Sequence, residues 1–95
     1  MAAYVYMLRC RDGSLYTGWT NNVRHRLAMH QQGKGAKYTR GRGPVVLVYT
    51  EKLPDKIAAL KREAALKKLS HRAKETLCRD YLQQDGDLNL NLPAK

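Results

Sequence analysis

The chain has 95 residues, which is enough for one domain but too few for two hydrophobic cores. Its 18 lysines and arginines outnumber eight acidic residues, and the resulting charge of +10 favours a polyanionic partner. The two cysteines, Cys10 and Cys78, have no further ligands at metal-binding spacing, so neither a disulfide framework nor a zinc site is indicated. No apolar run of about 18 residues and no secretory signal is present, so we expect a cytoplasmic protein without a membrane partner.

The positive charge is unevenly distributed. Residues 1–50 carry eight basic residues and one acidic residue, whereas residues 51–95 carry ten basic and seven acidic residues. The surface that meets a polyanion is therefore expected mainly in the first half. A non-catalytic nucleic-acid binder would show the same charge, so charge alone does not separate it from an enzyme.

The first 20 residues predict a β-hairpin. Residues 3–10 are almost all apolar or aromatic, which is typical of a central strand covered on both faces. An Asp-Gly turn in residues 11–14 leads to a second strand at residues 15–19. Tyr6 and Tyr16 then lie on neighbouring strands and can share one face of the sheet.

A helix and a glycine-rich basic loop are expected next. Residues 20–22 are Thr-Asn-Asn, good capping residues, and Val23, Leu27 and His30 follow at the spacing of one helical face. Arg26 precedes His30 by one turn. The loop at residues 31–44 lacks the Lys-Ser ending of a nucleotide-binding loop. Its basic residues are predicted to contact the phosphates of a nucleic acid, with a solvated loop without ligand as the alternative; they are Lys34, Lys37, Arg40 and Arg42.

The second half predicts one strand and two helices. Residues 45–49 are a β-branched run that indicates a third strand, and Pro54-Asp55 begins a helix. The expected core-facing residues of this helix are Ile57, Ala59, Leu60, Ala64, Leu66 and Leu69. Ser70 is the predicted cap of a last helix whose inward residues are Ala73, Leu77, Cys78, Tyr81 and Leu82. Residues 1–83 are thus expected to form a single domain, and residues 84–95 a polar, loosely ordered tail.

Glu63 is the only acidic residue within the apolar helix, and a carboxylate at the margin of a core needs a partner. One explanation is an ordinary surface ion pair with Lys67, four residues later. The other is a bound cation, for which Mg²⁺ is suited because it is often held by one or two carboxylates together with waters and substrate phosphates.

Tyrosine, arginine and histidine could supply the other groups of a phosphodiester-cleaving site. A phenol with a pKa of about 10 is a poor base unless nearby cations stabilise the phenolate, and Arg26 could provide such a charge while binding phosphate oxygens. His30 either orients or donates a proton, or is an ordinary histidine at the end of a helix. Tyr4 and Tyr49 are expected to pack in the core.

The order of these residues resembles the GIY-YIG nuclease family, most closely its small single-domain members, over about residues 3–82. The residues that carry the resemblance are Tyr4-Val5-Tyr6, Tyr16-Thr17-Gly18, Arg26, His30 and Glu63. The resemblance implies an α+β fold in which a three-stranded antiparallel sheet is flanked by about three helices. It implies catalytic roles for Tyr6, Tyr16, Arg26 and Glu63, with Mg²⁺ or Mn²⁺ at Glu63 and a tyrosine that helps to deprotonate the attacking water.

The chain departs from the family pattern in two ways. Tyr4 and Thr17 replace a glycine and an isoleucine of the family name, and neither Asn89 nor Asn91 matches the late asparagine of larger members. The expected function is that of a metal-dependent endonuclease that cuts DNA rather than RNA, in repair or recombination. A non-catalytic nucleic-acid-binding module on the same scaffold is the alternative, and the sequence leaves the oligomeric state open.

Overall fold

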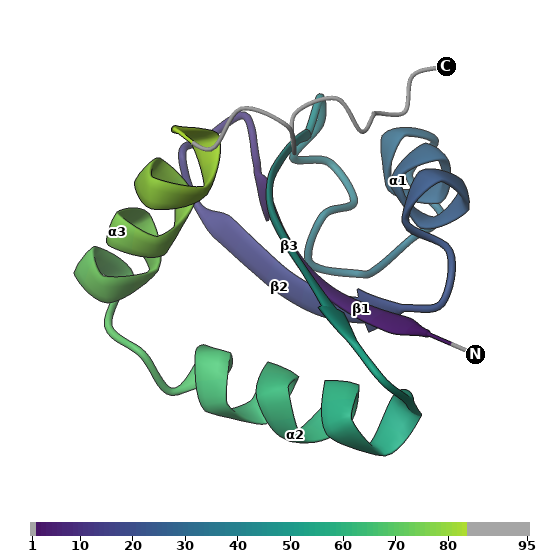
Figure 1. The fold of residues 1–95 in the computed structure, drawn as a ribbon. Coiled ribbons are helices and arrows are strands. Elements are labelled where there is room, and N and C mark those ends of the chain that lie inside the picture. Colours follow the sequence, from purple (N-terminus) through teal and green to yellow (C-terminus); the bar gives the residue numbers. More distant parts are fainter. Residues whose placement is uncertain (1, 84–95) are drawn as a thin grey trace.

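The computed structural model describes residues 2–83, which form a three-stranded sheet with three helices (Figure 1). The elements in chain order are β1 (Ala3–Arg9), β2 (Leu15–Thr20), α1 (Val23–Gln31), β3 (Val46–Leu53), α2 (Lys56–Lys67) and α3 (His71–Leu82). The α+β class expected from the sequence is confirmed. The predicted tail, residues 84–95, lies outside the described residues.

Strand β1 lies at the centre of the sheet, as its continuous apolar character predicts. The strand order is β2-β1-β3, and both pairings are antiparallel. Gly18 pairs with Tyr6, and Tyr16 pairs with Leu8, the next residue on the same face of β1. Because directly paired residues present their side chains on one face, Tyr6 and Tyr16 share a face of the sheet.

Strand β3 is longer than the sequence predicts. It extends to Leu53, although the β-branched run ends near residue 49. The added residues are mostly polar, and all four pair with residues 3–6 of β1. An edge strand needs no continuous apolar run, which is why the sequence signal ended early.

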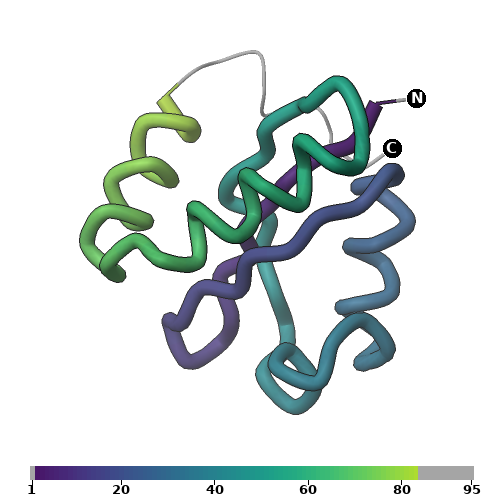
Figure 2. Tube along the Cα trace, turned by 90° about the horizontal axis from the view of Figure 1, so that it is seen from below, coloured from purple at the N-terminus to yellow at the C-terminus, as the bar shows by residue number. Residues whose placement is uncertain are grey.

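The helices cover opposite faces of the sheet. Ala59 and Leu66 of α2 pack against Ala3 and Val5, and α3 adds Cys78 beside Met7. The other face, which carries Tyr6 and Leu8, is covered by Leu27 of α1 and by Val45 at the end of the basic loop. Figures 1 and 2 show α1 and α2 as well-separated helices with the sheet between them.

The predicted core face of α2 is right for Ala59 and Leu66 and wrong for its other four residues. Ile57 is 65% exposed and Leu60 is 41% exposed, whereas Ala59 and Leu66 are buried. Ala64 and Leu69 are exposed as well, as is Leu82 in α3. Apolar residues surround α2 on most sides, so periodicity could not select its buried face; the small Ala59 allows the helix to approach β1 closely. Glu63 is one helical turn from both Ala59 and Leu66, so it lies near the side of α2 that faces the sheet.

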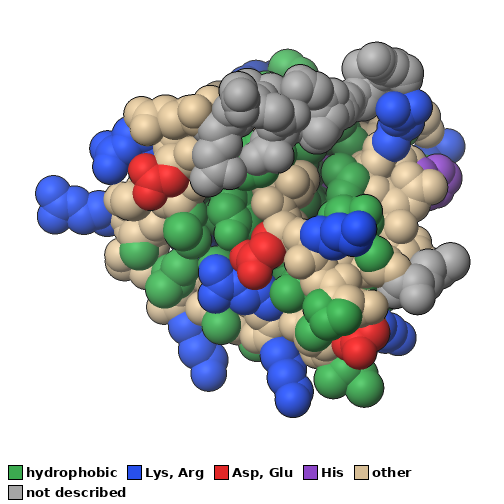
Figure 3. Space-filling model, in the orientation of Figure 1, with side chains coloured by type: hydrophobic (Ala, Val, Ile, Leu, Met, Phe, Trp, Pro, Cys, Tyr) green, Lys and Arg blue, Asp and Glu red, His purple; other side chains and the backbone are tan. Residues whose placement is uncertain are grey.

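Polar side chains begin the helices as predicted. Asn22, Asp55 and Ser70 each accept a hydrogen bond from the backbone N–H three residues later, at the start of α1, α2 and α3. None of the helices within residues 2–83 is both long and apolar enough to span a membrane. On the face drawn in Figure 3, lysine and arginine side chains project around the rim and acidic side chains are few.

Candidate active site

The phenol of Tyr6 is the centre of the candidate site. Its side chain is almost fully buried, and its hydroxyl lies 2.8 Å from Nε2 of His30 in α1. The space for the ring comes from Gly18, its partner on β2. A Cβ at Gly18 would lie 2.8 Å from the phenol oxygen of Tyr6, so only glycine leaves room for this side chain across the edge strand.

His30 lies in a chain of three hydrogen bonds. The hydroxyl of Thr39 donates to the carbonyl of Ala36 at 3.1 Å and lies 2.8 Å from Nδ1 of His30. Since the one hydrogen of Thr39 is used, Nδ1–H of His30 donates to it, and Nε2 is left to accept the hydrogen of Tyr6. Burial, with a smaller contribution from the charge of Arg26, lowers the pKa of His30 to about 4. The imidazole is therefore neutral at pH 7, as this bonding requires.

Arg26 lies one turn before His30 and is fixed by the loop. Its Nη2 donates to the carbonyl of Gly35 at 2.8 Å. A Cβ at Gly35 would collide with the ring of His30, so a glycine is needed for the loop to pack this closely. The guanidinium of Arg26 also lies within hydrogen-bonding reach of the Tyr6 hydroxyl, and its other N–H groups can bind phosphate oxygens.

Burial dominates the acidity of Tyr6. Burial raises the pKa of Tyr6 to about 12, Arg26 opposes this through a hydrogen bond and its charge, and Tyr16 and Glu63 raise it further. Arg26 thus acts in the expected direction, but its effect is smaller than that of burial, and Tyr6 is protonated in the free protein. Since Tyr16, Arg26 and Glu63 each affect the pKa of Tyr6, all three lie within electrostatic reach of its hydroxyl.

Tyr16 is the more accessible of the two phenols. Its ring centroid lies 6.3 Å from that of Tyr6 and 5.2 Å from that of His30, and it stacks on Tyr38 of the loop. Tyr16 is half-buried, and its hydroxyl makes no hydrogen bond within residues 2–83. A substrate can therefore reach this hydroxyl, whereas the hydroxyl of Tyr6 is engaged with His30.

The surroundings of Glu63 are compatible with both an ion pair to Lys67 and a bound cation. Its Oε2 lies 3.0 Å from Nζ of Lys67, so the ordinary i, i+4 pair forms. The Glu63 side chain is nevertheless only 16% exposed, against 53% for Lys67. Its other oxygen, Oε1, makes no hydrogen bond or ion pair in the part of the chain that the structure describes. That oxygen is available to a cation.

A divalent metal at Glu63 would have one carboxylate from the protein. No group of three or more His, Cys, Asp or Glu side chains suitable for a metal occurs within residues 2–83. A single carboxylate fits Mg²⁺ or Mn²⁺, which can fill its other positions with water and phosphate oxygens.

The four basic residues of the loop fall into two groups. Lys34, Lys37 and Arg40 are exposed, and their side chains make no hydrogen bond or ion pair within the described residues. Arg42 instead bonds to Asp12 and to the carbonyl of Tyr38. Three loop cations are thus free to contact phosphate, and the fourth is engaged inside the protein.

Two residues of the site were missed by sequence reasoning. Thr39 is buried and orients His30, and Tyr38 stacks on Tyr16. The only signal in the sequence is that a tyrosine and a threonine interrupt a run of glycines and basic residues. These contacts depend on how the loop folds back over α1, which local patterns do not encode.

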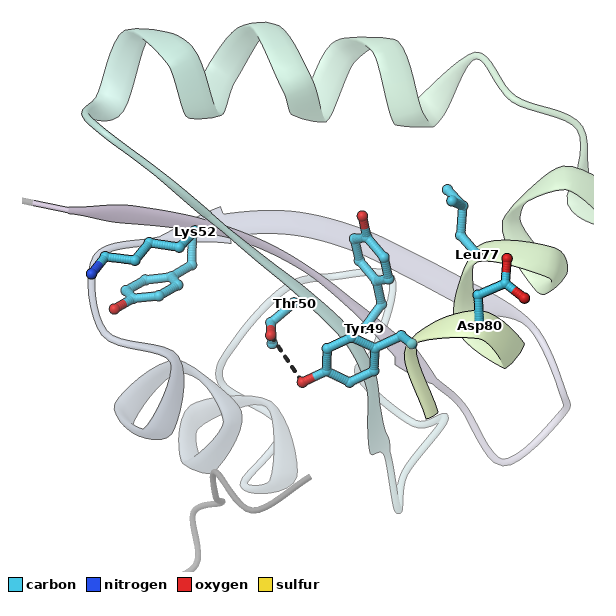
Figure 4. Close-up of a pocket in the computed structure, with 7 residues that line it drawn as sticks. Tyr49, Thr50, Lys52, Leu77 and Asp80 are labelled. Atoms are coloured by element: carbon cyan, nitrogen blue, oxygen red, sulfur yellow. Dashed lines mark hydrogen bonds between the residues drawn. The ribbon is translucent and has the colours of Figure 1, made fainter. Parts of the chain in front are cut away.

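A separate hollow of about 530 Å³ lies between β3 and α3 (Figure 4). Tyr4 and Tyr49, expected in the core, are half-buried and line it, and the hydroxyls of Thr50 and Tyr81 are 3.0 Å apart within it. The residues that line it include none of the predicted catalytic residues. The candidate active site is therefore the cluster around Tyr6.

Comparisons with known proteins show the family and agree with the fold. A family model described as the GIY-YIG catalytic domain matches residues 2–76. UPF0213 protein OB0043 from Oceanobacillus iheyensis is 61% identical over 66 residues, which cover 70% of this chain and 77% of that protein. The solution NMR structure of UPF0213 protein BH0048 from Bacillus halodurans is similar at 49% identity and a TM-score of 0.55, over 92% of this chain and 90% of the other. That of protein EF2693 from E. faecalis has 41% identity and a TM-score of 0.59, over 88% and 90%.

Proposed function

The chain belongs to the GIY-YIG family, whose catalytic domain is of nuclease type, and from this premise we propose that it is a metal-dependent endonuclease acting on DNA. The observation that carries the proposal is the convergence of four side chains on one phenol. His30 bonds to Tyr6, and the charges of Arg26 and Glu63 and the ring of Tyr16 act on the same group. The four side chains come from three elements, β2, α1 and α2, and the phenol itself from β1, an arrangement that a plain binding surface does not require.

The hydrogen-bond chain gives Tyr6 a route for its proton. As the attacking water loses a proton to the oxygen of Tyr6, the phenol passes its own hydrogen to Nε2 of His30. In the free protein this transfer is unfavourable, because the pKa of Tyr6 is raised and that of His30 is lowered. The negative charge of a bound phosphate favours the imidazolium form of His30. The relay would thus remain neutral until substrate binds.

In this proposal Arg26 binds the phosphate and Tyr16 contacts the substrate. The N–H groups of Arg26 that are not bonded to Gly35 or Tyr6 stabilise the negative charge that builds up on the phosphate oxygens, and the hydroxyl of Tyr16 contacts the substrate or the attacking water. Glu63 would hold Mg²⁺ or Mn²⁺. When bound, such an ion lowers the pKa of water and neutralises phosphate charge.

The substrate is assigned to the damaged or branched DNA of repair and recombination. The exposed cations Lys34, Lys37 and Arg40 extend from the loop that covers the site. Contacts of lysine and arginine with phosphates position a nucleic acid but carry no direct sequence information. A domain that relies on them distinguishes shapes rather than base sequences.

The test is cleavage of supercoiled plasmid and of labelled branched and linear DNA by the wild type and by Glu63→Gln, with Mg²⁺, Mn²⁺ or chelator. Asp80→Asn, an exposed residue on α3, is the matched control because it removes the same charge. We expect metal-dependent nicking, faster on branched DNA, that is abolished by Glu63→Gln and retained by Asp80→Asn. DNA affinity, measured by fluorescence anisotropy, should change less than about threefold in both variants.

The alternative is a non-catalytic nucleic-acid-binding module, favoured by the exposed cations of the loop. It predicts salt-dependent binding without cleavage by any of the three proteins. Nicking that survives in Glu63→Gln, or an equal loss of cutting and binding in that variant, would contradict the assignment of Glu63 as the metal ligand.

A further inference from the structure

Tyr38 forms an aromatic stack with Tyr16 that no core packing requires. The two ring centroids are 5.8 Å apart and the ring planes are inclined by only 25°. Tyr38 is 39% exposed and belongs to none of the buried clusters, so its removal leaves no large cavity. The stack is the contact that the loop makes with the accessible phenol of the candidate site.

Arg42 fixes both the ring and the backbone of Tyr38. Its guanidinium carbon lies 4.3 Å from the ring centroid of Tyr38, and its Nη1 donates to the carbonyl of Tyr38 at 2.6 Å. A cation over an aromatic face and a short bond to the same residue together restrict where the ring can lie. Tyr38 is therefore held from its own loop, four residues away.

The anchor of Arg42 is the β1–β2 turn. Its Nε lies 3.2 Å from Oδ2 of Asp12, whose other oxygen accepts hydrogen bonds from the backbone and the hydroxyl of Ser14. The backbone N–H of Arg11 also donates to the carbonyl of Arg42 at 2.8 Å. Since Tyr16 follows Ser14 by two residues, the contacts form a closed circuit from the turn through Arg42 and Tyr38 back to β2.

This circuit distinguishes Arg42 from the phosphate-binding cations of the loop. Two of its N–H groups are used within the protein, and the carboxylate of Asp12 beside it repels a phosphate. Arg40, two residues earlier, is exposed and has no such partner in the described chain. The two arginines are therefore expected to act in different ways.

We propose that Tyr38, held by Arg42, is a positioning residue that fixes the ring of Tyr16 for catalysis. The inference rests on the proposed function in that Tyr16 acts on the substrate. Without the stack, Tyr16 keeps its contacts with His30 and with the buried cluster around Tyr6, and its ring loses the contact on the side of the loop. A small misplacement of a reacting group lowers the rate of the chemical step more than it lowers binding.

The test compares Tyr38→Ala with Tyr38→Phe, and Arg42→Gln with Arg40→Gln. Each protein carries ¹³C-labelled tyrosine, so that the ring signals of Tyr16 report its position without any need for activity. Cleavage rates are measured with supercoiled plasmid and labelled DNA, and DNA affinities by fluorescence anisotropy.

We expect Tyr38→Ala to move the Tyr16 ring signals and to lower kcat about tenfold or more, while KM changes by less than about twofold. Tyr38→Phe keeps the aromatic ring and should retain the wild-type ring signals and kcat. Arg42→Gln should follow Tyr38→Ala, whereas Arg40→Gln should weaken DNA binding and leave the Tyr16 ring signals in place. Unmoved Tyr16 signals in Tyr38→Ala, or a loss confined to KM, would overturn the positioning role. If the wild type does not cut DNA, the proposed function fails, while the ring signals still decide whether Tyr38 holds Tyr16.

Discussion

Lowering the pH from 8 to 5 should remove about 2 kcal/mol of the free energy of unfolding through His30 alone. The pKa of His30 is lowered from 6.5 to about 4 in the folded state because the ring is buried and lies near Arg26. Between these values the unfolded chain binds a proton that the folded chain does not, so stability rises with pH in this window. One pKa unit corresponds to 1.36 kcal/mol, so the whole effect is roughly 3 kcal/mol, of which about 2 kcal/mol is lost by pH 5.

Between pH 7 and pH 5 the effect of His30 on stability can be distinguished from the effects of the carboxylates. Hydrogen bonds from Ser14 lower the pKa of Asp12 to about 2, and the bond from Arg9 lowers that of Glu75. Asp12 and Glu75 stabilise the fold at pH values above their ordinary pKa. This stabilisation is lost as the pH falls toward their pKa values in the folded state, mainly below pH 5. The decline between pH 7 and pH 5 should therefore come mostly from His30.

The assay is urea unfolding followed by the fluorescence of Trp19, the only tryptophan, at pH 8, 7, 6 and 5. His30→Gln should start less stable at pH 8 but lose about 2 kcal/mol less on going to pH 5. His25→Gln, a change at an exposed histidine on the same helix, should keep the slope of the wild type. Parallel slopes for the wild type and His30→Gln, or a pKa of His30 near 6.5 by NMR titration, would refute the reasoning.

Three further predictions address the packing around the site. Gly18→Ala places a Cβ 2.8 Å from the phenol oxygen opposite it, and should cost about 1–3 kcal/mol in urea unfolding; wild-type stability would show that the phenol moves aside freely. Leu66→Ala should cost about 2–5 kcal/mol and Leu60→Ala about 1 kcal/mol or less, and the reverse order would mean that α2 buries the other face. Thr39→Val should cost about 1–3 kcal/mol and alter the ring ¹⁵N shifts of His30, whereas Thr39→Ser keeps both; unchanged shifts in the valine variant would contradict the bonded tautomer.

The strands, the helix caps and the family pattern could be predicted from the sequence because each depends on local chemistry. The apolar run of β1 permits no exposed face, and this placed it at the centre of the sheet. Asn22, Asp55 and Ser70 are short polar residues that satisfy the first N–H groups of a helix wherever it packs. The order of Tyr6, Tyr16 and the later residues was sufficient to indicate the family.

Which apolar residues of α2 stay exposed, and which contacts the loop makes, could not be predicted. Ile57 and Leu60 are as apolar as Leu66, so only the shape of the sheet decides that Ala59 and Leu66 face it. For the loop, Arg42 is chemically the same as Arg40, and its different partners arise from Asp12, which lies 30 residues earlier in the chain. Such distinctions are tertiary and leave no periodic signal.

The neutral groups and the charged groups of this small domain are placed differently. Tyr6, His30 and Thr39 form a buried chain of uncharged hydrogen bonds, which avoids the cost of ions in the interior. Arg26 and Glu63, the charged members, remain partly exposed at its border. If a phosphate and a cation bind at this border, they alter the proton affinities of the buried chain without entering it. The protein can therefore keep a stable neutral core in the free state and still respond to substrate, and this response is what the pH dependence of wild type and His30→Gln would measure with and without DNA.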